Sequence, residues 1–235
     1  MPIPTRAGYE FVGWFYDAPC YDGGTFEGSD FAVVPRTYMY TDNITVWIQA
    51  YRNDWSTFTG AQIISCTEGG GWGVGYQANT TGHGTEIYVD GVGYRGIDFN
   101  YNSLSSGWHT FCFTFASGTY TGYVDGVSVG TVNTGGSAIK YHGSNAIFVG
   151  AEAGSSASTP AGAYFTGDIS SAIITNSSTV PVAITSSTPV GTSHTYYAVW
   201  RPENVKGFYV GTQKARVYVG STLVKQIYRG STRIV

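Results

Sequence analysis

The chain has 235 residues, of which 33 are glycine and 19 tyrosine, and only 11% are charged. This composition disfavours helices and favours strands joined by tight turns. The sequence contains no apolar run of the roughly 20 residues that a membrane helix needs, and the first 30 residues lack the order of a secretory signal. We therefore expect an all-β protein that does not follow the usual export route.

The net charge of −3 is unevenly distributed along the chain. Residues 201–235 hold seven Lys or Arg residues and one Glu, which gives +6, whereas residues 1–200 hold five basic and 14 acidic residues, which gives −9. The C-terminal segment is therefore predicted to be a separate electrostatic unit.

The first motif in the chain is PTRAGYEFVGWFYD at residues 4–17. It resembles the core of the internalin B-type repeat of Listeria and Bacteroides surface proteins. That resemblance implies a Thr-Leu-Tyr-Ala-x-Trp ending, and the matching string, TYYAVW, stands only at residues 195–200. The resemblance therefore implies a repeat split by an inserted domain, in which residues 4–30 pair with 188–200. The strand that usually precedes the motif is missing, and a neighbouring chain is one source for it.

Short alternating segments separated by turn residues fill the region between residues 31 and 180. Residues 44–51, ITVWIQAY, alternate between two faces as a strand does. Phenylalanines alternate in the same way along residues 107–116, and Asp-Gly pairs at 90–91 and 125–126 predict hairpins. Strands that recur every eight to twelve residues predict a two-sheet antiparallel sandwich.

Six segments in this region carry a second resemblance. The order TVWIQA, AQIIS, GWHTFCFTF, GYVDGVSVG, IFVG and FTGDISSAIIT resembles the laminin G-like, concanavalin-like jelly roll. The resemblance implies an all-β, two-sheet jelly roll as the main domain. The predicted organisation is a first half-repeat at 1–30, the jelly roll at 31–180, a second half-repeat at 181–200 and a basic strand-rich tail at 201–235.

The C-terminal tail contains a short repeat that begins with Tyr209, Tyr218 and Tyr228, at spacings of nine and ten. Repeats this short need neighbours or a partner surface. The tail resembles the endings of structural and tail-associated bacteriophage proteins. Its charges alternate with apolar residues, which favours docking on other virion proteins or oligomerisation over a nucleic-acid arm or a solvated end. The docking candidates are Tyr209, Arg216, Tyr218, Lys225, Tyr228, Arg229 and Arg233.

Enzymatic activity is not expected from the motifs. Laminarinase-type glycoside hydrolases place paired carboxylates on one strand face. In the nearest string, TEIYVD at 85–90, Glu86 and Asp90 share a face, but Tyr88 replaces the central acid and Asp90 belongs to an Asp-Gly turn. The sequence contains no GxSxG, HExxH or phosphate-loop motif. A laminarinase-type hydrolase is therefore the least favoured alternative.

The cysteines and acids give little indication of a metal site. Cys20, Cys66 and Cys112 form no CxxC pair, and we expect them to be buried thiols. No cofactor is expected, although the jelly-roll resemblance leaves open a calcium ion at Asp98 or Asp168 with loop carbonyls. Asp168 belongs to the Gly-Asp-Ile sequence of the last predicted strand, where a structural role is the better explanation. A calcium ion also needs more oxygen ligands than one acid supplies.

Ligand binding is the favoured activity. Tyr and Trp side chains on the loops or faces of such sandwiches supply stiff contact area with a polar tip. For each aromatic candidate the simpler alternative is packing. The residues that stand outside the expected core alternation are Tyr51, Trp55, Trp72, Tyr76, Tyr94, Asp98 and Tyr101.

Together the resemblances imply a non-enzymatic bacteriophage virion protein, as a capsid decoration, head fibre or tail adhesin. It would be assembled in the host cytoplasm and would lie on the virion surface. Its expected partners are other virion proteins, bacterial or mucosal glycans, and further copies of itself; membrane and nucleic acid are not expected. A bacterial cell-surface adhesin is the alternative that the N-terminal motif favours.

Overall fold

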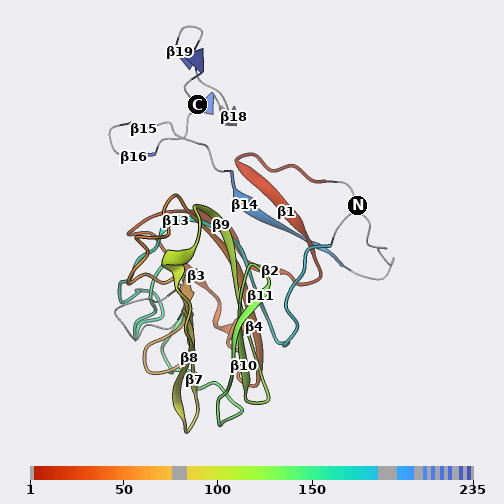
Figure 1. Cartoon of the computed structure of the whole chain (residues 1–235), viewed down its shortest axis with the longest axis vertical. Helices are drawn as coiled ribbons and strands as arrows, with labels where there is room; N and C mark the ends of the chain where they lie inside the picture. The colour runs from red at the N-terminus through yellow and green to blue at the C-terminus, as the bar shows by residue number, and fades with distance from the viewer. Residues whose placement is uncertain are drawn as a thin grey trace.

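The computed structural model describes residues 3–75, 84–184 and 195–203, and the backbone of six short strands between residues 209 and 233. Antiparallel strands form two six-stranded sheets and four two-stranded sheets, three of which belong to the C-terminal tail (Figure 1). Two 3-10 turns, η1 (Arg36–Tyr38) and η3 (Tyr101–Ser103), interrupt the strands. The predicted all-β antiparallel sandwich is confirmed. Among the described residues, no helix has the length and apolar character required to span a bilayer.

The first six-stranded sheet, here called the β4 sheet, has the order β11-β10-β9-β4-β13-β2. Its longest strands lie at the centre, where β4 pairs with β9 over ten residues. The strands are β2 (Pro19–Glu27), β4 (Asn43–Arg52), β9 (Gly107–Ala116), β10 (Thr119–Val124), β11 (Val127–Asn133) and β13 (Thr166–Thr175).

The second six-stranded sheet, here called the β6 sheet, has the order β3-β12-β5-β6-β7-β8. Its strands are shorter, and long loops connect several of them. They are β3 (Ala32–Val34), β5 (Ile64–Ser65), β6 (Trp72–Val74), β7 (Thr85–Val89), β8 (Gly93–Ile97) and β12 (Ile147–Val149).

The main core lies between the two sheets. The predicted inner face of β4, which consists of Ile44, Val46, Ile48 and Ala50, is fully buried in this core. Alternate phenylalanines of β9 and apolar residues of the β6 sheet complete it. Burial of apolar area at roughly 25 cal/mol per Å² makes this core the main source of stability.

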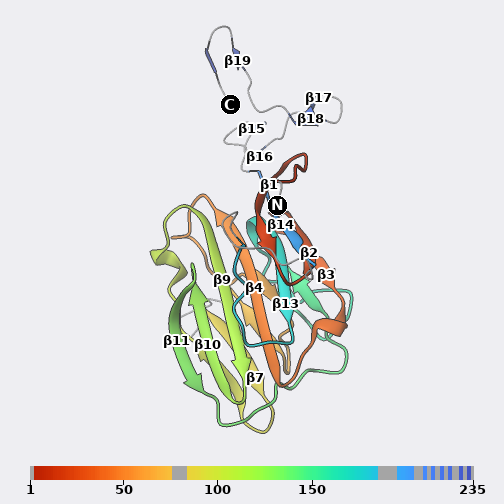
Figure 2. The same cartoon turned by 90° about the vertical axis from the view of Figure 1, so that its right-hand side faces the viewer.

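A small two-stranded sheet covers the outer face of the β4 sheet (Figure 2). β1 (Tyr9–Phe15) pairs antiparallel with β14 (Tyr197–Pro202), from Tyr9 opposite Pro202 to Phe15 opposite Tyr197. A second apolar cluster lies between this small sheet and the sandwich, and its buried members are Phe15, Trp47, Cys112, Ile173 and Val199.

The boundary expected at residue 30 differs from the structure. β2, at residues 19–27, pairs with β13 at the edge of the β4 sheet, so it belongs to the sandwich. The hydroxyl of Thr25 also donates to the carboxylate of Asp168, 2.6 Å away. The N-terminal contribution to the small sheet is therefore β1 alone. That β1 and β14 form an internalin B-type repeat stays a prediction.

Each repeat of the C-terminal tail contains one pair of antiparallel two-residue strands. Tyr209 pairs with Lys214, Tyr218 with Leu223, and Tyr228 with Arg233. Arg216 and Lys225 lie outside the described residues. The strands are β15 (Tyr209–Val210), β16 (Gln213–Lys214), β17 (Tyr218–Val219), β18 (Thr222–Leu223), β19 (Tyr228–Arg229) and β20 (Thr232–Arg233). The docking role of this segment stays a prediction.

Candidate functional site

The candidate site lies on the outer face of the β6 sheet, on the opposite side of the sandwich from the small sheet. One row of paired residues crosses five strands on this face: Phe148, Ser65, Gly73, Glu86 and Gly96. Because side chains alternate along a strand, Glu86 projects outward while its neighbours Thr85 and Ile87 are buried.

The loop of residues 151–163 covers one half of this face. The Ser65 hydroxyl donates to the carbonyl of Ala151 at 3.1 Å and accepts from the amide of Ala153 at 2.8 Å. The backbone amide of Gln62 donates to the carbonyl of Ala163 at 2.9 Å. These contacts hold the loop over β12 and β5, on the left-hand side of the sheet in Figure 1. The outer face of β7 and β8 lies beside the loop.

A hollow of about 390 Å³ opens at the lip of this loop. Its lining residues include three that carry a hydroxyl and one that carries a carboxylate, which are groups that can recognise a hydroxylated ligand. Its lining residues are Glu68, Gly154, Ser155, Ser156, Thr159, Pro160 and Ala161.

Glu68 is held in an unfavourable backbone conformation at this lip. Its φ of 89° lies in the region that glycine adopts without strain and other residues avoid. The side-chain amide of Asn145 donates to the carbonyls of Glu68 at 3.0 Å and Thr67 at 2.7 Å. The surrounding structure therefore enforces the strained conformation.

Three carboxylates give this face a negative potential. Burial and the nearby Glu68 carboxylate raise the pKa of Glu152 above its usual value. Burial and the charges of Glu86 and Glu68 likewise raise the pKa of Tyr94. Tyr94 is 41% exposed and lies edge-on to Tyr88, with ring centroids 4.8 Å apart. An exposed aromatic edge therefore lies beside three carboxylates.

Two buried polar side chains lie beneath the same face. A Cβ at Gly73 would stand 2.9 Å from Oε1 of Gln62 and 3.1 Å from Cγ2 of Thr67, so the absent side chain of Gly73 lets both approach. Gln62 is fully buried and Thr67 is 3% exposed. Neither polar atom of the Gln62 amide nor the Thr67 hydroxyl has a hydrogen-bond partner among the described residues. Such groups are costly unless something satisfies them.

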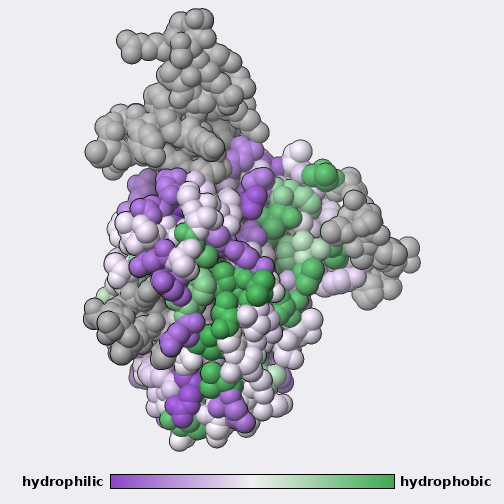
Figure 3. Space-filling model, in the orientation of Figure 1, coloured by the Kyte–Doolittle hydropathy of each residue, from purple (hydrophilic) through white to green (hydrophobic). Residues whose placement is uncertain are grey.

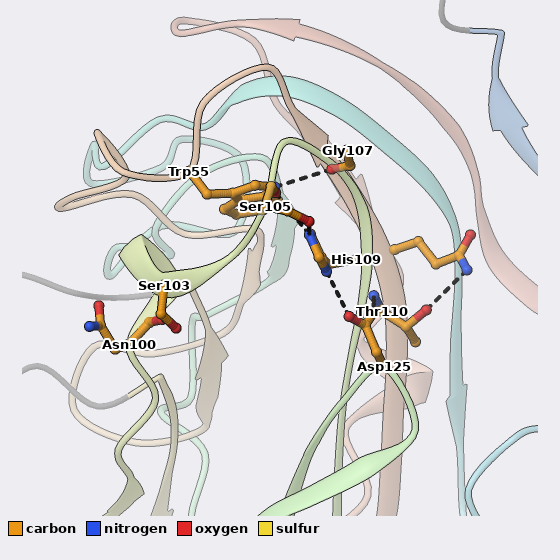
Figure 4. A network of polar contacts seen from close by, with 9 residues as sticks. Trp55, Asn100, Ser103, Ser105, Gly107, His109, Thr110 and Asp125 are labelled. Carbon is orange, nitrogen blue, oxygen red and sulfur yellow. Dashed lines mark hydrogen bonds and ion pairs between the residues drawn. The ribbon is translucent and has the colours of Figure 1, made fainter.

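A second polar network joins His109 and Asp125 at the other sheet (Figure 4). Nδ1 of His109 lies 2.6 Å from Oδ2 of Asp125, and its Nε2 lies 3.5 Å from the Ser105 hydroxyl. This arrangement resembles a Ser-His-Asp triad. However, Nε2 is closer to the Ser105 carbonyl, at 3.0 Å, which only accepts hydrogen bonds. Nε2 therefore acts as a donor and is not placed to remove the serine proton.

The same network fixes the start of β9, where the sequence reads GWHT at residues 107–110. The amide of Thr110 donates to Oδ1 of Asp125 at 2.7 Å, and the Trp55 indole donates to the carbonyl of Gly107 at 3.1 Å. Asp125 is thus bonded to both His109 and Thr110 at the hairpin between β10 and β11. These contacts give His109 a structural role.

Three of the predicted binding residues are core residues. Trp55, Trp72 and Tyr101 are fully buried, so the prediction that they stand outside the core was wrong. Trp55 and Tyr101 come from loops that fold back over the end of the sandwich, where their rings stack 6.0 Å apart. Trp72 lies on the inner face of β6 and packs against Phe113. The prediction for Trp72 was based on the alternation of inward and outward side chains along a strand. The three glycines before Trp72 interrupt that pattern.

The other predicted residues are scattered. Only Tyr94 lies at the candidate site. Tyr51 is half-buried and packs against Trp108, with ring centroids 5.7 Å apart, and Asp98 is exposed beyond the end of β8. Tyr76 lies outside the described residues.

Two acids at the candidate site, Glu68 and Glu152, were not predicted from the sequence. For Glu68 a signal was available, because it directly precedes three glycines.

The described residues give no support for a metal centre. Asp168 is buried and accepts a hydrogen bond from Thr25, as a structural residue of β13 would. Within the described ranges, no three His, Cys, Asp or Glu side chains form a metal-binding group. The cysteines, which are 20, 66 and 112, are free thiols; the last two are buried and the first is half-buried.

Comparison with known proteins identifies the family of the sandwich. The profile of the concanavalin A-like lectin/glucanases superfamily matches residues 26–185. No curated protein matches the sequence. The CBM40 of the Ruminococcus gnavus IT-sialidase, solved bound to α2,3-sialyllactose, is similar with a TM-score of 0.51 and 14% identity, covering 68% of this chain and 92% of that one.

Two further solved structures show weaker similarity. Domain 4 of AbnA, a GH43 extracellular arabinanase from Geobacillus stearothermophilus solved with arabinotriose, has a TM-score of 0.47 and 13% identity, covering 67% of this chain and 72% of that one. Domains LG4-5 of the mouse laminin α1 chain have a TM-score of 0.41 and 12% identity, covering 78% of this chain and 48% of that one. At this identity the comparison with CBM40 shows the fold alone.

Proposed function

Because the chain belongs to the concanavalin A-like lectin/glucanases superfamily, we propose that its sandwich binds carbohydrate on the outer face of the β6 sheet. The observation that carries the proposal is the convergence of Tyr94, Glu68 and the hydroxyl-lined hollow on one face. An aromatic side chain provides a surface for the apolar face of a sugar ring, and carboxylate and hydroxyl groups bond its hydroxyls. The similar CBM40, which was solved with a bound oligosaccharide, supports this class of ligand.

The outer face of the β4 sheet is a poorer candidate for the carbohydrate-binding site. Phe15 and Val199 of the small sheet pack there against Trp47. A ligand on that face would have to displace buried apolar contacts. The β6 face requires no such displacement at Tyr94, which is already exposed.

We propose binding without hydrolysis because Glu86 and Asp90, the carboxylate pair suggested by the sequence, are not arranged for catalysis. β7 ends at Val89, so Asp90 lies in the turn, where its carboxylate is 3.9 Å from the Lys140 ammonium. The second acid of a glycosidase must instead face the same bond as the first. Glu86→Gln is therefore expected to leave any sugar release from oligosaccharides unchanged, and loss of such release would support the hydrolase alternative.

The binding proposal has a matched test. Tyr94→Ala is expected to weaken binding to the best oligosaccharide on a glycan array by about tenfold, the effect of losing about 1.4 kcal/mol of contact. Tyr197→Ala is the control, because Tyr197 is similarly exposed, at 37%, but lies on the small sheet. Equal effects of the two changes, or binding to no glycan, would contradict the proposal.

We also propose that the sandwich is displayed on a bacteriophage particle and docks through residues 201–235. The +6 charge of this segment and its resemblance to phage structural proteins support the proposal. Its three strand pairs, of two residues per strand, are too small to be stable alone and require a partner surface. A bacterial surface adhesin is the alternative.

Mass spectrometry of purified particles of the phage that encodes the chain is expected to detect it. A chain that lacks residues 204–235 should keep the thermal transition of the sandwich but be absent from the particles. Incorporation of the shortened chain at the normal level would contradict docking through the tail. Absence of the full chain from particles would contradict the virion role and leave carbohydrate binding untouched.

A further inference from the structure

We infer that the candidate site selects neutral or amine-bearing sugars and rejects acidic ones. This inference rests on the proposed carbohydrate-binding function and adds the substrate class. Its basis is the position of Glu68, Glu86 and Glu152 around one face that also carries an exposed aromatic ring. A carboxylate on the ligand would be placed among three protein carboxylates, whereas a hydroxyl would be a hydrogen-bond donor to them.

The charges of Glu68 and Glu86 contribute to raised pKa values of two groups at this face, Glu152 and Tyr94. Glu68 acts on Glu152, whose pKa is raised first by burial and then by that charge. Glu86 and Glu68 both act on the phenol of Tyr94, whose pKa is raised in the same sense. Glu68, which lines the hollow, therefore acts on both a second carboxyl group and a phenol at this face. A ligand carboxylate meets the same field, and a ligand ammonium group relieves it.

Of three bases in the neighbouring segments, one is paired with an acid, and two donate to backbone carbonyls and keep their charge. Lys140 lies 3.9 Å from Asp90, the guanidinium of Arg95 donates to the backbone carbonyl of Tyr94 at 2.8 Å, and that of Arg36 donates to the carbonyl of His142 at 3.4 Å. Residues 31–184 contain nine acids and four bases, which gives −5. The wider surface of the sandwich therefore adds to the local repulsion of an anionic ligand.

The backbone at Glu68 indicates that its side chain has a role. Residues 69–71 are all glycine, and glycine at 68 would remove the strain that φ of 89° imposes. Instead a glutamate occupies the position, and hydrogen bonds from the Asn145 side chain to the carbonyls of Thr67 and Glu68 hold it there. A purely structural role at this position would be better served by glycine.

Matched oligosaccharide pairs test the inference on the full-length chain by isothermal titration calorimetry. The pairs are lactose with 3′-sialyllactose, galactotetraose with tetragalacturonate, and chitotetraose with its deacetylated form. We expect the acidic member to bind at least about tenfold more weakly than its neutral partner, since a carboxylate about 6 Å from an anion weakens its binding roughly threefold in water and three carboxylates contribute. The deacetylated tetramer should bind at least as tightly as chitotetraose. Raising the salt concentration should narrow each difference.

Glu68→Gly is the decisive variant. It should raise the melting temperature, because it removes backbone strain, and should strengthen binding of the acidic sugars about threefold. Glu68→Gln should give the same change in selectivity without the gain in stability. Glu27→Gln is the control, because Glu27 is an exposed acid at the edge of the β4 sheet, and it should change neither property.

The outcomes separate this inference from the proposed function. If acidic sugars bind as well as their neutral partners, or if Glu68→Gly and Glu68→Gln leave selectivity unchanged, the inference is wrong while carbohydrate binding stands. If no member of any pair binds, both are wrong.

Discussion

The ring of Phe15 lies against the indole of Trp47, with ring centroids 5.1 Å apart, and this contact joins the small sheet to the sandwich. Both side chains are nearly fully buried, at 2% and 5% exposure. β1 therefore covers a face of the β4 sheet that would otherwise expose a tryptophan.

A double-mutant cycle tests this junction. Phe15→Ala and Trp47→Ala should each lower the free energy of unfolding by about 3 kcal/mol or more. Their combined effect should fall short of the sum by about 1 kcal/mol, because the ring contact is counted in both single changes. Urea denaturation measures all four proteins. Trp47→Ala combined with Phe148→Ala should be additive, since Phe148 lies on the outer face of the other sheet; additivity in the first pair would mean that the small sheet does not pack there.

Gly71 and Gly91 share a left-handed backbone but differ in their surroundings. Their φ angles are 73° and 71°. A Cβ at Gly71 would stand 2.1 Å from the carbonyl oxygen of Cys66, whereas one at Gly91 would meet nothing within 4 Å. Gly91→Ala should cost about 1 to 2 kcal/mol from backbone strain alone, and Gly71→Ala about 3 kcal/mol or more. Comparable melting temperatures for the two variants would contradict the close packing of the 66–71 loop.

Asp125 stabilises the β10–β11 hairpin through its side chain. Asp125→Gly removes the bonds to His109 and Thr110 but suits the φ of 50°, and should cost about 2 kcal/mol. Asp125→Ala should cost about 1 kcal/mol more because it adds backbone strain. Chemical denaturation measures both changes. Ser105→Ala should have little effect on stability or on sugar binding. If it strongly reduced sugar release, Ser105, His109 and Asp125 would have to be reconsidered as a catalytic triad.

The buried thiols predict a loss of stability in alkali. Burial raises the pKa of Cys20 from 9.0 to about 12, and it also raises the pKa of Cys66 and Cys112. The unfolded thiols ionise near pH 9 while the folded ones stay protonated, so the folded state binds more protons above that pH. Stability is therefore full below pH 9 and should fall between pH 9 and 12, by at most about 1.4 kcal/mol per pH unit for each thiol.

Urea midpoints measured between pH 7 and 11 check this expectation. Cys20→Ala should reduce the slope above pH 9 and leave the midpoint below pH 9 nearly independent of pH. A midpoint that rises with pH above 9 would contradict the sign of the effect.

Strand β11 is an unprotected edge. Val127 and Val129 are 68% and 37% exposed, residues 127–133 carry no charge, and apolar atoms gather over this part of the sandwich in Figure 3. Val127→Lys should reduce aggregation on heating, measured by light scattering, with little change in melting temperature. Val33→Lys, on the three-residue edge strand β3, should have a smaller effect. If Val33→Lys reduced aggregation more than Val127→Lys does, the aggregation-prone edge would be β3 and not β11.

The strands and the main core were predictable because local chemistry determines them. The alternation of Ile44, Val46 and Ile48 requires one buried face, and the Asp-Gly pair at 125–126 supplies the backbone angles of a hairpin. Neither inference depends on distant residues.

Alternation along a strand does not show what covers each face, and that was decided by the tertiary structure alone. Trp47 has the same local pattern as an exposed residue, but β1 and β14 meet over it from opposite ends of the chain. Trp55 and Tyr101 are buried because their loops fold back onto each other. The candidate site arises in the same way: Glu68, Glu86 and Glu152 are far apart in the sequence, and their charges act together only because long-range pairing places one loop beside the next.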